Sequence, residues 1–378
     1  MSAGAATRRR RACTVAALAA LLLVLTGCAQ LTDISQRSLI FGLGLDDGPE
    51  PGMVTLSAQA MHPNLGGAGG GSTTGGGGGG GSGGGSTGFR TLAVHGQTFS
   101  KALSQLQAET DRQLFLGQVA VVFLGAPLAR AGVLHDMDTL LRSPQIPETM
   151  QVAVVEGRAV SFLRSGTTRQ GSWQVLRFLQ QPRTGQAVLA NSFWHFMSQS
   201  LDLATATYAP AFVPNPAGEG FRFVGTAVLV GGRLVDTLSP SQTDALSWVI
   251  HHGPFGGASV GSRGEEIHIA VLGVRATWDL SEPTLPVLRV IATGQVTASP
   301  GTSLADRPSQ MTQLLQQAMT VQLEGLLHRL RADGADLFGI GEVLRERGAL
   351  PPGPWPASFK TLHFAVSVRL HLITGKIR

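Results

Sequence analysis

One short segment of the chain has the residue types and spacing of a catalytic serine. Gly257-Ala258-Ser259-Val260-Gly261 matches the G-x-S-x-G pattern, whose serine must lie on a tight turn between a strand and a helix. Here the segment follows a predicted helix and precedes a predicted strand, so the context is reversed. The chain contains 50 glycines, which makes a chance match expected. We therefore interpret Ser259 as non-catalytic and predict no enzymatic activity.

Histidines and acids come close together at few places. His135 and Asp138 have the spacing that puts two metal ligands on one face of a helix, but no third ligand is identifiable. The pair His251-His252 falls where a predicted helix ends, and imidazoles there complement the helix dipole. We predict no metal site. Two further histidines are expected in water, on the polar face of the last predicted strand: His363 and His371.

Glycine-containing motifs that could hold a phosphate are incomplete. Gly375-Lys376 lacks the upstream glycine and the helix of a P-loop. Gly339-Ile340-Gly341 lacks the third glycine of a dinucleotide-binding fingerprint. The sequence therefore implies no cofactor.

The N-terminus carries the chemistry that we consider most informative. Four arginines, Arg8 to Arg11, precede an apolar run from Ala12 to Val24 and then Leu25-Thr26-Gly27-Cys28. A basic start, a short apolar middle and small residues before a cleavage point are typical of a secretory signal, and the cysteine makes it a lipoprotein signal. We predict cleavage between Gly27 and Cys28 and a diacylglycerol thioether on the Cys28 sulfur. An ordinary signal cut elsewhere and an uncleaved anchor remain alternatives.

Export changes how charge and cysteine content are interpreted. Residues 1–27 contain four arginines and no acid, so 25 basic residues remain against 24 acidic ones. This balance gives little support to a nucleic-acid partner. Cys13 leaves with the signal and Cys28 is the lipid site, so an internal disulfide is excluded. Stability must then come from packed cores, and 351 residues predict two or three domains.

The region 28–210 has a mixed pattern of strands and helices. Strands are predicted at Ser38–Leu45, Met53–Met61 and Phe89–His95, and Gln118–Leu124 is a continuous apolar run typical of a strand covered on both faces. Predicted helices begin after Thr98 and Pro127 and cover Leu134–Leu141, and Met150–Val155 is another strand. The Gly/Ser/Thr tract at 66–88 is interpreted as a long flexible hairpin loop, although a domain boundary is an alternative.

The next part of the chain is less regular. Residues 158–207 look helical in pieces, with Trp173 and Leu201 among the side chains expected to be buried, and a subdomain boundary near 158 is an option. The clustered prolines at 210, 214 and 216 predict a loop and mark our boundary with a second region, 217–378.

The region 217–378 contains firmer patterns. Gly231-Gly232 predicts a two-residue hairpin turn, and Ser239-Pro240-Ser241-Gln242 is a capping box that starts a helix reaching Trp248 to His252. Long strands are predicted at Glu266–Trp278 and Leu285–Ala298. A helix from Ser309 to Ala332 has one apolar stripe, a shorter helix covers Asp336–Glu346, and an alternating strand starts at Thr361. The predicted fold class is mixed α/β or α+β, with several sheets packed against helices.

Five segments, taken in order behind the lipoprotein signal, resemble the Ger(x)C family, the lipoprotein C subunit of bacterial spore germinant receptors. The segments are Cys28–Asp46, Arg112–Gly132, Leu140–Gly157, Phe223–Trp248 and Asp336–Trp355.

The resemblance implies a three-domain fold of sheets packed with helices. It also implies a non-enzymatic subunit anchored by its lipid to the outer face of the spore inner membrane, where it assembles with integral membrane subunits A and B. Direct small-molecule binding is not expected. A stand-alone lipoprotein that binds a small solute or acts as a hydrolase is the alternative.

Overall fold

The computed structural model describes most of the predicted exported chain. The described residues are 36–61, 89–165, 171–181, 186–215, 220–250, 255–261, 267–282, 285–298 and 308–373. The chain divides into two compact units, Met1–Arg37 and Ser38–Arg378. The predicted signal, Gly27, Cys28, the tract at 66–88, His251, His252 and Gly375-Lys376 lie outside the described residues.

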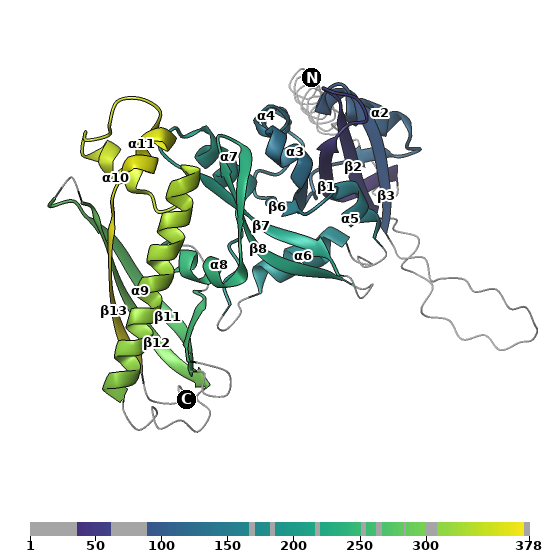
Figure 1. Cartoon of the computed structure of the whole chain (residues 1–378). Helices are drawn as coiled ribbons and strands as arrows, with labels where there is room; N and C mark the ends of the chain where they lie inside the picture. Colours follow the sequence, from purple (N-terminus) through teal and green to yellow (C-terminus); the bar gives the residue numbers. More distant parts are fainter. Residues whose placement is uncertain are drawn as a thin grey trace, which may run out of the picture. The chain divides into compact units, whose positions relative to one another are not determined.

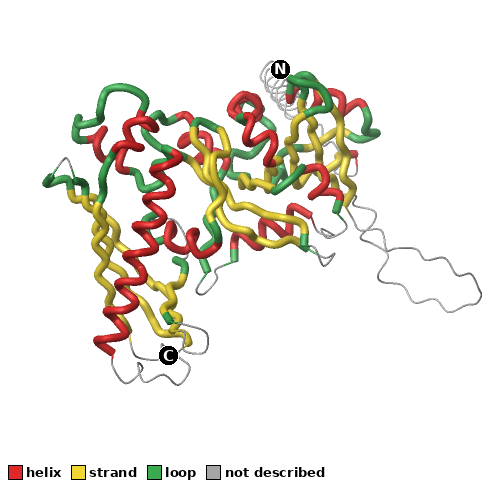
Figure 2. The backbone as a smooth tube through the Cα atoms, viewed as in Figure 1, coloured by secondary structure: helices red, strands yellow, loops and turns green. Residues whose placement is uncertain are grey.

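A nine-stranded sheet forms the first part of the fold (Figures 1 and 2). Its strands follow the order β3-β2-β1-β5-β6-β7-β8-β9, and β4 pairs with β1. Parallel pairing joins β1, β5, β6 and β7, and antiparallel strands extend the sheet on both sides. The bounds are β1 (Arg37–Asp47), β2 (Val54–Met61), β3 (Phe89–Gly96), β4 (Gln113–Phe115), β5 (Val121–Gly125), β6 (Gln151–Val155), β7 (Thr207–Pro214), β8 (Phe221–Val230) and β9 (Arg233–Leu238).

Strands β2 and β3 form the hairpin predicted on either side of the Gly/Ser/Thr tract. They pair antiparallel from Met61 opposite Phe89 to Val54 opposite Gly96. Both faces of β2 are buried. Its polar side chains find hydrogen-bond partners inside the protein. The Oε1 atom of Gln59, for example, accepts hydrogen bonds from the backbone N–H and the hydroxyl of Ser172, each at 2.8 Å.

Helices cover both faces of the parallel strands. Along β5, Val122 and Leu124 belong to one apolar cluster and Val121 and Phe123 to another, which confirms the prediction of a strand covered on both faces. The first cluster includes residues of α2 (Phe99–Ala108), α3 (Ala126–Ala131), α4 (Leu134–Leu141) and α7 (Phe193–Leu201). The second includes residues of α5 (Ala159–Arg164) and α6 (Gly171–Gln180).

Two side chains in this region were predicted to be buried, and both predictions are wrong. Trp173 is 43% exposed and Leu201 is 59% exposed. Both stand on short helices, α6 and α7, in which only one stripe reaches a core. The predicted helical pieces themselves are confirmed as α5, α6 and α7.

Pro210 and Pro214 do not lie in the predicted loop, and Pro216 lies outside the described residues. Pro210 lies inside β7 opposite Thr226, and Pro214 ends that strand opposite Phe221. Antiparallel pairing continues from β7 to β8 and β9, so one sheet spans the predicted boundary between 28–210 and 217–378. The position of that domain boundary stays a prediction. The hairpin turn at Gly231-Gly232 is confirmed, with φ of 55° and 73°.

A second sheet carries the C-terminal part, in the order β10-β11-β12-β13. Its strands are β10 (Gly257–Val260), β11 (Ile267–Asp279), β12 (Val287–Ala298) and β13 (Ala365–Ile373). Strands β12 and β13 run parallel. The crossover between them contains α9 (Pro308–Asp333), α10 (Ile340–Glu346) and α11 (Trp355–Thr361), because parallel neighbours need a long connection.

Helix α9 covers one face of this sheet with the apolar stripe predicted from the sequence (Figure 1). The stripe residues Met311, Leu315, Met319, Leu323, Leu326 and Leu330 are buried in one cluster with alternate residues of β11, β12 and β13. Gly334, with φ of 72°, follows the helix as predicted. Among the described residues, no helix has the length and apolar character needed to cross a membrane.

Several element ends differ from the predictions, three of them notably in the C-terminal half. Helix α8 (Pro240–Ser247) has the predicted capping box but ends before the predicted Trp248–His252. Helix α10 begins at Ile340 rather than Asp336, and β13 begins at Ala365 rather than Thr361, which belongs to α11. The mixed α+β, multi-domain fold class is confirmed.

Candidate functional site at the junction of the two sheets

The serine of the G-x-S-x-G match lies inside a strand. Ser259 belongs to β10 and stands opposite His268 of β11 in an antiparallel pair. A nucleophile elbow needs its serine on a turn that leads from a strand into a helix. The geometry around Ser259 therefore differs from that of a serine hydrolase.

The candidate metal ligands His135 and Asp138 both lie on α4, and Asp138 has another partner. Asp138 on α4 binds Arg142 one turn away, with 2.8 Å between Oδ2 and Nε, and this hydrogen bond lowers the pKa of the Asp138 carboxyl. His363 and His371 are exposed, as predicted. Within the described residues, no group of three histidine, cysteine or acidic side chains could hold a metal ion.

The segment Gly339-Ile340-Gly341 begins a helix whose N-terminus is already occupied. The buried carboxylate of Asp336 accepts hydrogen bonds from the N–H groups of Ile340 (3.3 Å) and Gly341 (2.7 Å) and from Nε1 of Trp355 (3.0 Å). Burial raises the pKa of Asp336 to about 6. Because an internal acid caps α10, this helix end is closed to an external anion.

A second internal carboxylate closes the carboxyl edge of the parallel strands. Asp46, near the end of β1, accepts the N–H groups of Ala159 (2.7 Å) and Val160 (2.9 Å) at the start of α5. Burial raises its pKa. A methyl group on Gly125 would overlap Oδ1 of Asp46, so the close approach requires glycine at the end of β5. In α/β proteins this edge commonly binds ligands, whereas here a side chain of the protein fills it.

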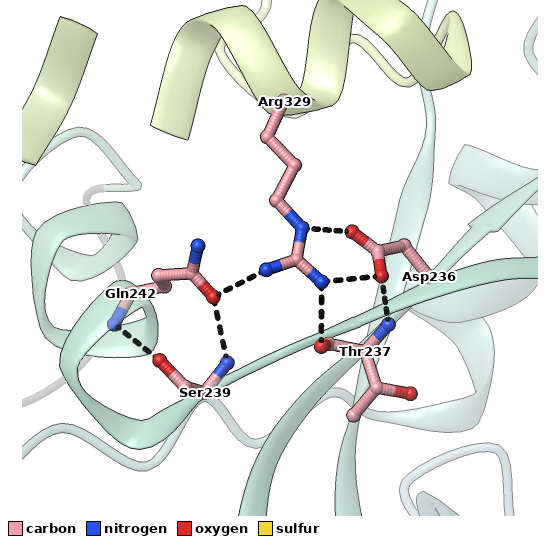
Figure 3. A network of polar contacts seen from close by, with 5 residues as sticks. All are labelled: Asp236, Thr237, Ser239, Gln242 and Arg329. Carbon is pink, nitrogen blue, oxygen red and sulfur yellow. Dashed lines mark hydrogen bonds and ion pairs between the residues drawn. The ribbon is translucent and has the colours of Figure 1, made fainter. Parts of the chain in front are cut away.

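The most developed polar network lies where the two sheets meet (Figure 3). Arg329 of α9 makes a bidentate pair with Asp236 of β9, at 2.5 Å from Nε and 2.7 Å from Nη2. Its Nη1 donates to Oε1 of Gln242 at 2.9 Å, and the same oxygen accepts the N–H of Ser239 in the capping box of α8. The pairing with Asp236 raises the pKa of Arg329. One guanidinium thus links three elements.

Further carboxylates fix the same junction. Arg345 of α10 binds Asp202, which follows α7, through two hydrogen bonds of 2.7 and 2.8 Å. Asp244 of α8 accepts the N–H of Ala187 at 2.6 Å, and burial raises its pKa to about 7. These contacts join segments that are more than 50 residues apart in the chain. We therefore interpret the junction as a part of the fold that these contacts hold in place.

A cavity of about 260 Å³ opens beside this junction. Its walls include Gln199, Tyr208, Phe338 and Glu342 together with Asp336. Burial raises the pKa of Tyr208 to about 12, so its hydroxyl is not a base near neutral pH. Asp336 already accepts three hydrogen bonds, and the cavity is smaller than typical ligand pockets of 300 to 1,000 Å³.

Sequence reasoning missed Asp46, Asp236, Asp336 and Arg329. The position of Asp336 shortly before a short helix was a local signal of capping. The partners of Asp46 and Asp236 are 113 and 93 residues away, and no local pattern indicates such pairs.

Two family models match the chain. The model described as "Spore germination protein N-terminal domain" matches residues 30–213, and the model described as "Spore germination B3/ GerAC like, C-terminal" matches residues 224–375. Together they cover nearly all of the chain after the predicted signal. Both matches include strands of the nine-stranded sheet.

Two curated proteins are similar in sequence. The "Putative spore germination protein YfkR" of Bacillus subtilis (strain 168) is 29% identical over 239 residues, which cover 61% of this chain and 58% of that protein. The "Spore germination protein GerQC" of Bacillus cereus is 22% identical over 149 residues, 39% of this chain and 41% of that protein. The alignments thus span less than two thirds of either relative.

The fold is similar to that of a solved structure. The crystal structure of the GerBC protein superimposes with a TM-score of 0.54 at 14% sequence identity, covering 90% of this chain and 100% of that one. At this identity the likeness concerns the fold, and it agrees with the two family models. The resemblance of the five segments is thereby confirmed, and the chain belongs to the Ger(x)C family of spore germination proteins.

Proposed function

We propose that the chain is a non-enzymatic, lipid-anchored subunit of a spore germinant receptor. It is exported, held on the outer face of the spore inner membrane by an acylated Cys28, and assembled with integral membrane subunits A and B. The observation that carries this proposal is the match of both spore germination models in order, over residues 30–213 and 224–375.

The proposed anchor is supported by the sequence before Ser38. Cys28 follows a basic start, an apolar run and small residues, which is the arrangement of an export signal. Two acyl chains on one sulfur bury enough methylene groups, at about 0.8 kcal/mol each, for stable attachment to a bilayer. Cys28 is the one cysteine that remains after cleavage at the predicted position.

The proposed absence of catalysis is supported by how the polar groups of the fold are used. The buried acids Asp46 and Asp336 accept backbone N–H groups at helix starts, and Asp138 binds Arg142. Ser259 lies in a strand. These side chains are thus engaged in contacts within the fold.

Co-purification from spore inner membrane tests the proposal. A tagged chain should be recovered together with two polytopic membrane proteins of the A and B kinds. Recovery without either would reject the receptor assignment and favour the stand-alone lipoprotein. The Cys28→Ala variant should leave the membrane fraction, whereas the matched Cys13→Ala variant, altered within the predicted signal, should remain there.

A further inference from the structure

The face of the C-terminal sheet opposite α9 presents a regular array of side chains. Strand pairing places Arg275 of β11, Ile291 of β12 and Arg369 of β13 side by side in one row. The next row contains Thr277, Arg289 and Ser367. Neighbouring strands lie about 4.8 Å apart, so each row spans about 10 Å. We call these two rows the arginine face.

The arginine face carries positive charge that the protein itself leaves largely unpaired. Arg275 and Arg369 are exposed, and within the described part of the chain neither guanidinium makes a hydrogen bond or an ion pair. Arg289 binds Asp279 at the end of β11. Asp279 is the one acid in β11, β12 and β13, although the chain after the predicted signal is nearly neutral. The positive charge is therefore a local feature.

An exposed apolar side chain lies between the two free arginines. Ile291 is 44% exposed in the middle of the first row, and Ile373, further along β13 on the same face, is 42% exposed. Thr277 and Ser367 in the second row carry short side chains, so the arginine side chains extend beyond them. Basic side chains around an exposed apolar one suit the interfacial zone of a bilayer with anionic lipids.

We propose that the arginine face docks on an anionic phospholipid surface and thereby orients the chain on its membrane. The occupant is argued from charge complementarity: two exposed guanidinium groups flank an exposed apolar side chain, and Asp279 is the one acid in these three strands. This inference rests on the proposed lipid anchor, which holds the chain close enough to the bilayer for a weak surface contact to matter.

The contact is tested on the lipidated chain reconstituted in vesicles. Ser367→Cys, in the second row, accepts a polarity-sensitive fluorophore, because Cys28 is acylated and Cys13 has been removed with the signal. Ser104→Cys, exposed on α2, is the matched control site. In phosphatidylcholine vesicles that contain phosphatidylglycerol, the probe at position 367 should report an apolar environment. In phosphatidylcholine alone it should report water, and the probe at position 104 should report water in both.

Loss of the two free arginines should abolish the response. Arg275→Gln with Arg369→Gln should lower the ratio of docked to undocked molecules about thirtyfold, which corresponds to about 2 kcal/mol for two arginines near an anionic surface. The control pair Arg130→Gln and Arg347→Gln removes the same charge from exposed positions elsewhere and should leave the ratio within about twofold. Salt at 1 M should also reduce docking, because it shortens the Debye length to about 3 Å.

The possible results distinguish a failure of the arginine face from a failure of the proposed lipid anchor. Protein that does not remain bound to vesicles of either lipid composition would contradict the proposed lipid anchor. Protein that stays bound while the probe at position 367 reports water in anionic vesicles overturns the arginine face. A response that appears in phosphatidylcholine only when the A and B proteins are added would also overturn it, in favour of an acidic protein partner. Inorganic phosphate that changes the fluorescence of the probe at position 367 in the absence of vesicles would identify a site for free anions instead.

Discussion

Replacement of Asp336 tests how the C-terminal crossover is held. In Asp336→Ala, three buried donors lose their acceptor: the N–H groups of Ile340 and Gly341 and the indole of Trp355. Each unpartnered donor costs about 1 to 3 kcal/mol. The variant also avoids burying a carboxylate, which offsets part of this loss near neutral pH. We expect the variant to unfold at clearly lower urea concentration than the wild type.

The pH dependence of that loss has a definite sign. Burial raises the pKa of Asp336 from 3.8 to about 6, so the folded protein binds a proton between these values that the unfolded chain does not. Folding is therefore more favourable below about pH 6 than above it. From the two pKa values, the contribution of Asp336 to the unfolding free energy grows by about 2 kcal/mol between pH 7.5 and pH 4.5. The alanine variant lacks this increase.

Urea unfolding at pH 7.5 and pH 4.5 measures the difference. The gap in unfolding free energy between wild type and Asp336→Ala should widen by about 2 kcal/mol at the lower pH. Trp355→Phe is the matched control: it removes one donor and should cost about 1 kcal/mol. It should keep the pH dependence and enlarge it slightly, because the lost hydrogen bond lowers the pKa of Asp336. A gap that stays constant or narrows on acidification would refute the argument.

Three further substitutions test the junction, the parallel strands and the hairpin. Arg329→Met removes the bidentate pair and should lower the unfolding free energy by about 1 kcal/mol, whereas Arg142→Met removes an exposed helix pair and should change it much less; equal losses by urea titration would contradict the network. Gly125→Ala should lower the melting temperature by several degrees because its methyl group overlaps a buried carboxylate, with a loss of about 1 to 3 kcal/mol. A methyl group at position 273 would meet open space, so Gly273→Ala should change stability by less than about 0.5 kcal/mol. Similar melting temperatures for Gly125→Ala and Gly273→Ala would count against the close contact at Gly125. Replacing residues 62–88 by a five-residue turn should stabilise the chain by about 1.5 kcal/mol through a smaller closure entropy, and loss of folding in calorimetry would show that the tract does more than connect two strands.

Local patterns in the sequence predict most of this fold. The stripe of α9, the Gly231-Gly232 hairpin and the capping box of α8 are set by neighbouring residues, so periodicity and turn chemistry find them. Proline at 210 misled the prediction because β7 tolerates it within a paired strand. The pairing of β7 with β8 across the predicted boundary leaves no mark on local composition.

The polar contacts of the fold were harder to predict than its elements. Arg329 and Asp236 are 93 residues apart, and Asp46 reaches the start of α5 across 113 residues. Such contacts depend on how elements pack, and a single sequence shows only which residues carry charge. The motifs that looked chemical, at Ser259 and His135, consist of common residues, and the structure shows them in ordinary strand and helix positions.

The most direct test of the account is the mass of the N-terminal peptide from protein isolated from spore membranes. We predict a chain that begins at Cys28 and carries a diacylglycerol thioether on its sulfur, with residues 1–27 absent. A free thiol at Cys28, or a peptide that still contains Arg8 to Arg11, would contradict the lipid-anchored receptor subunit proposed above.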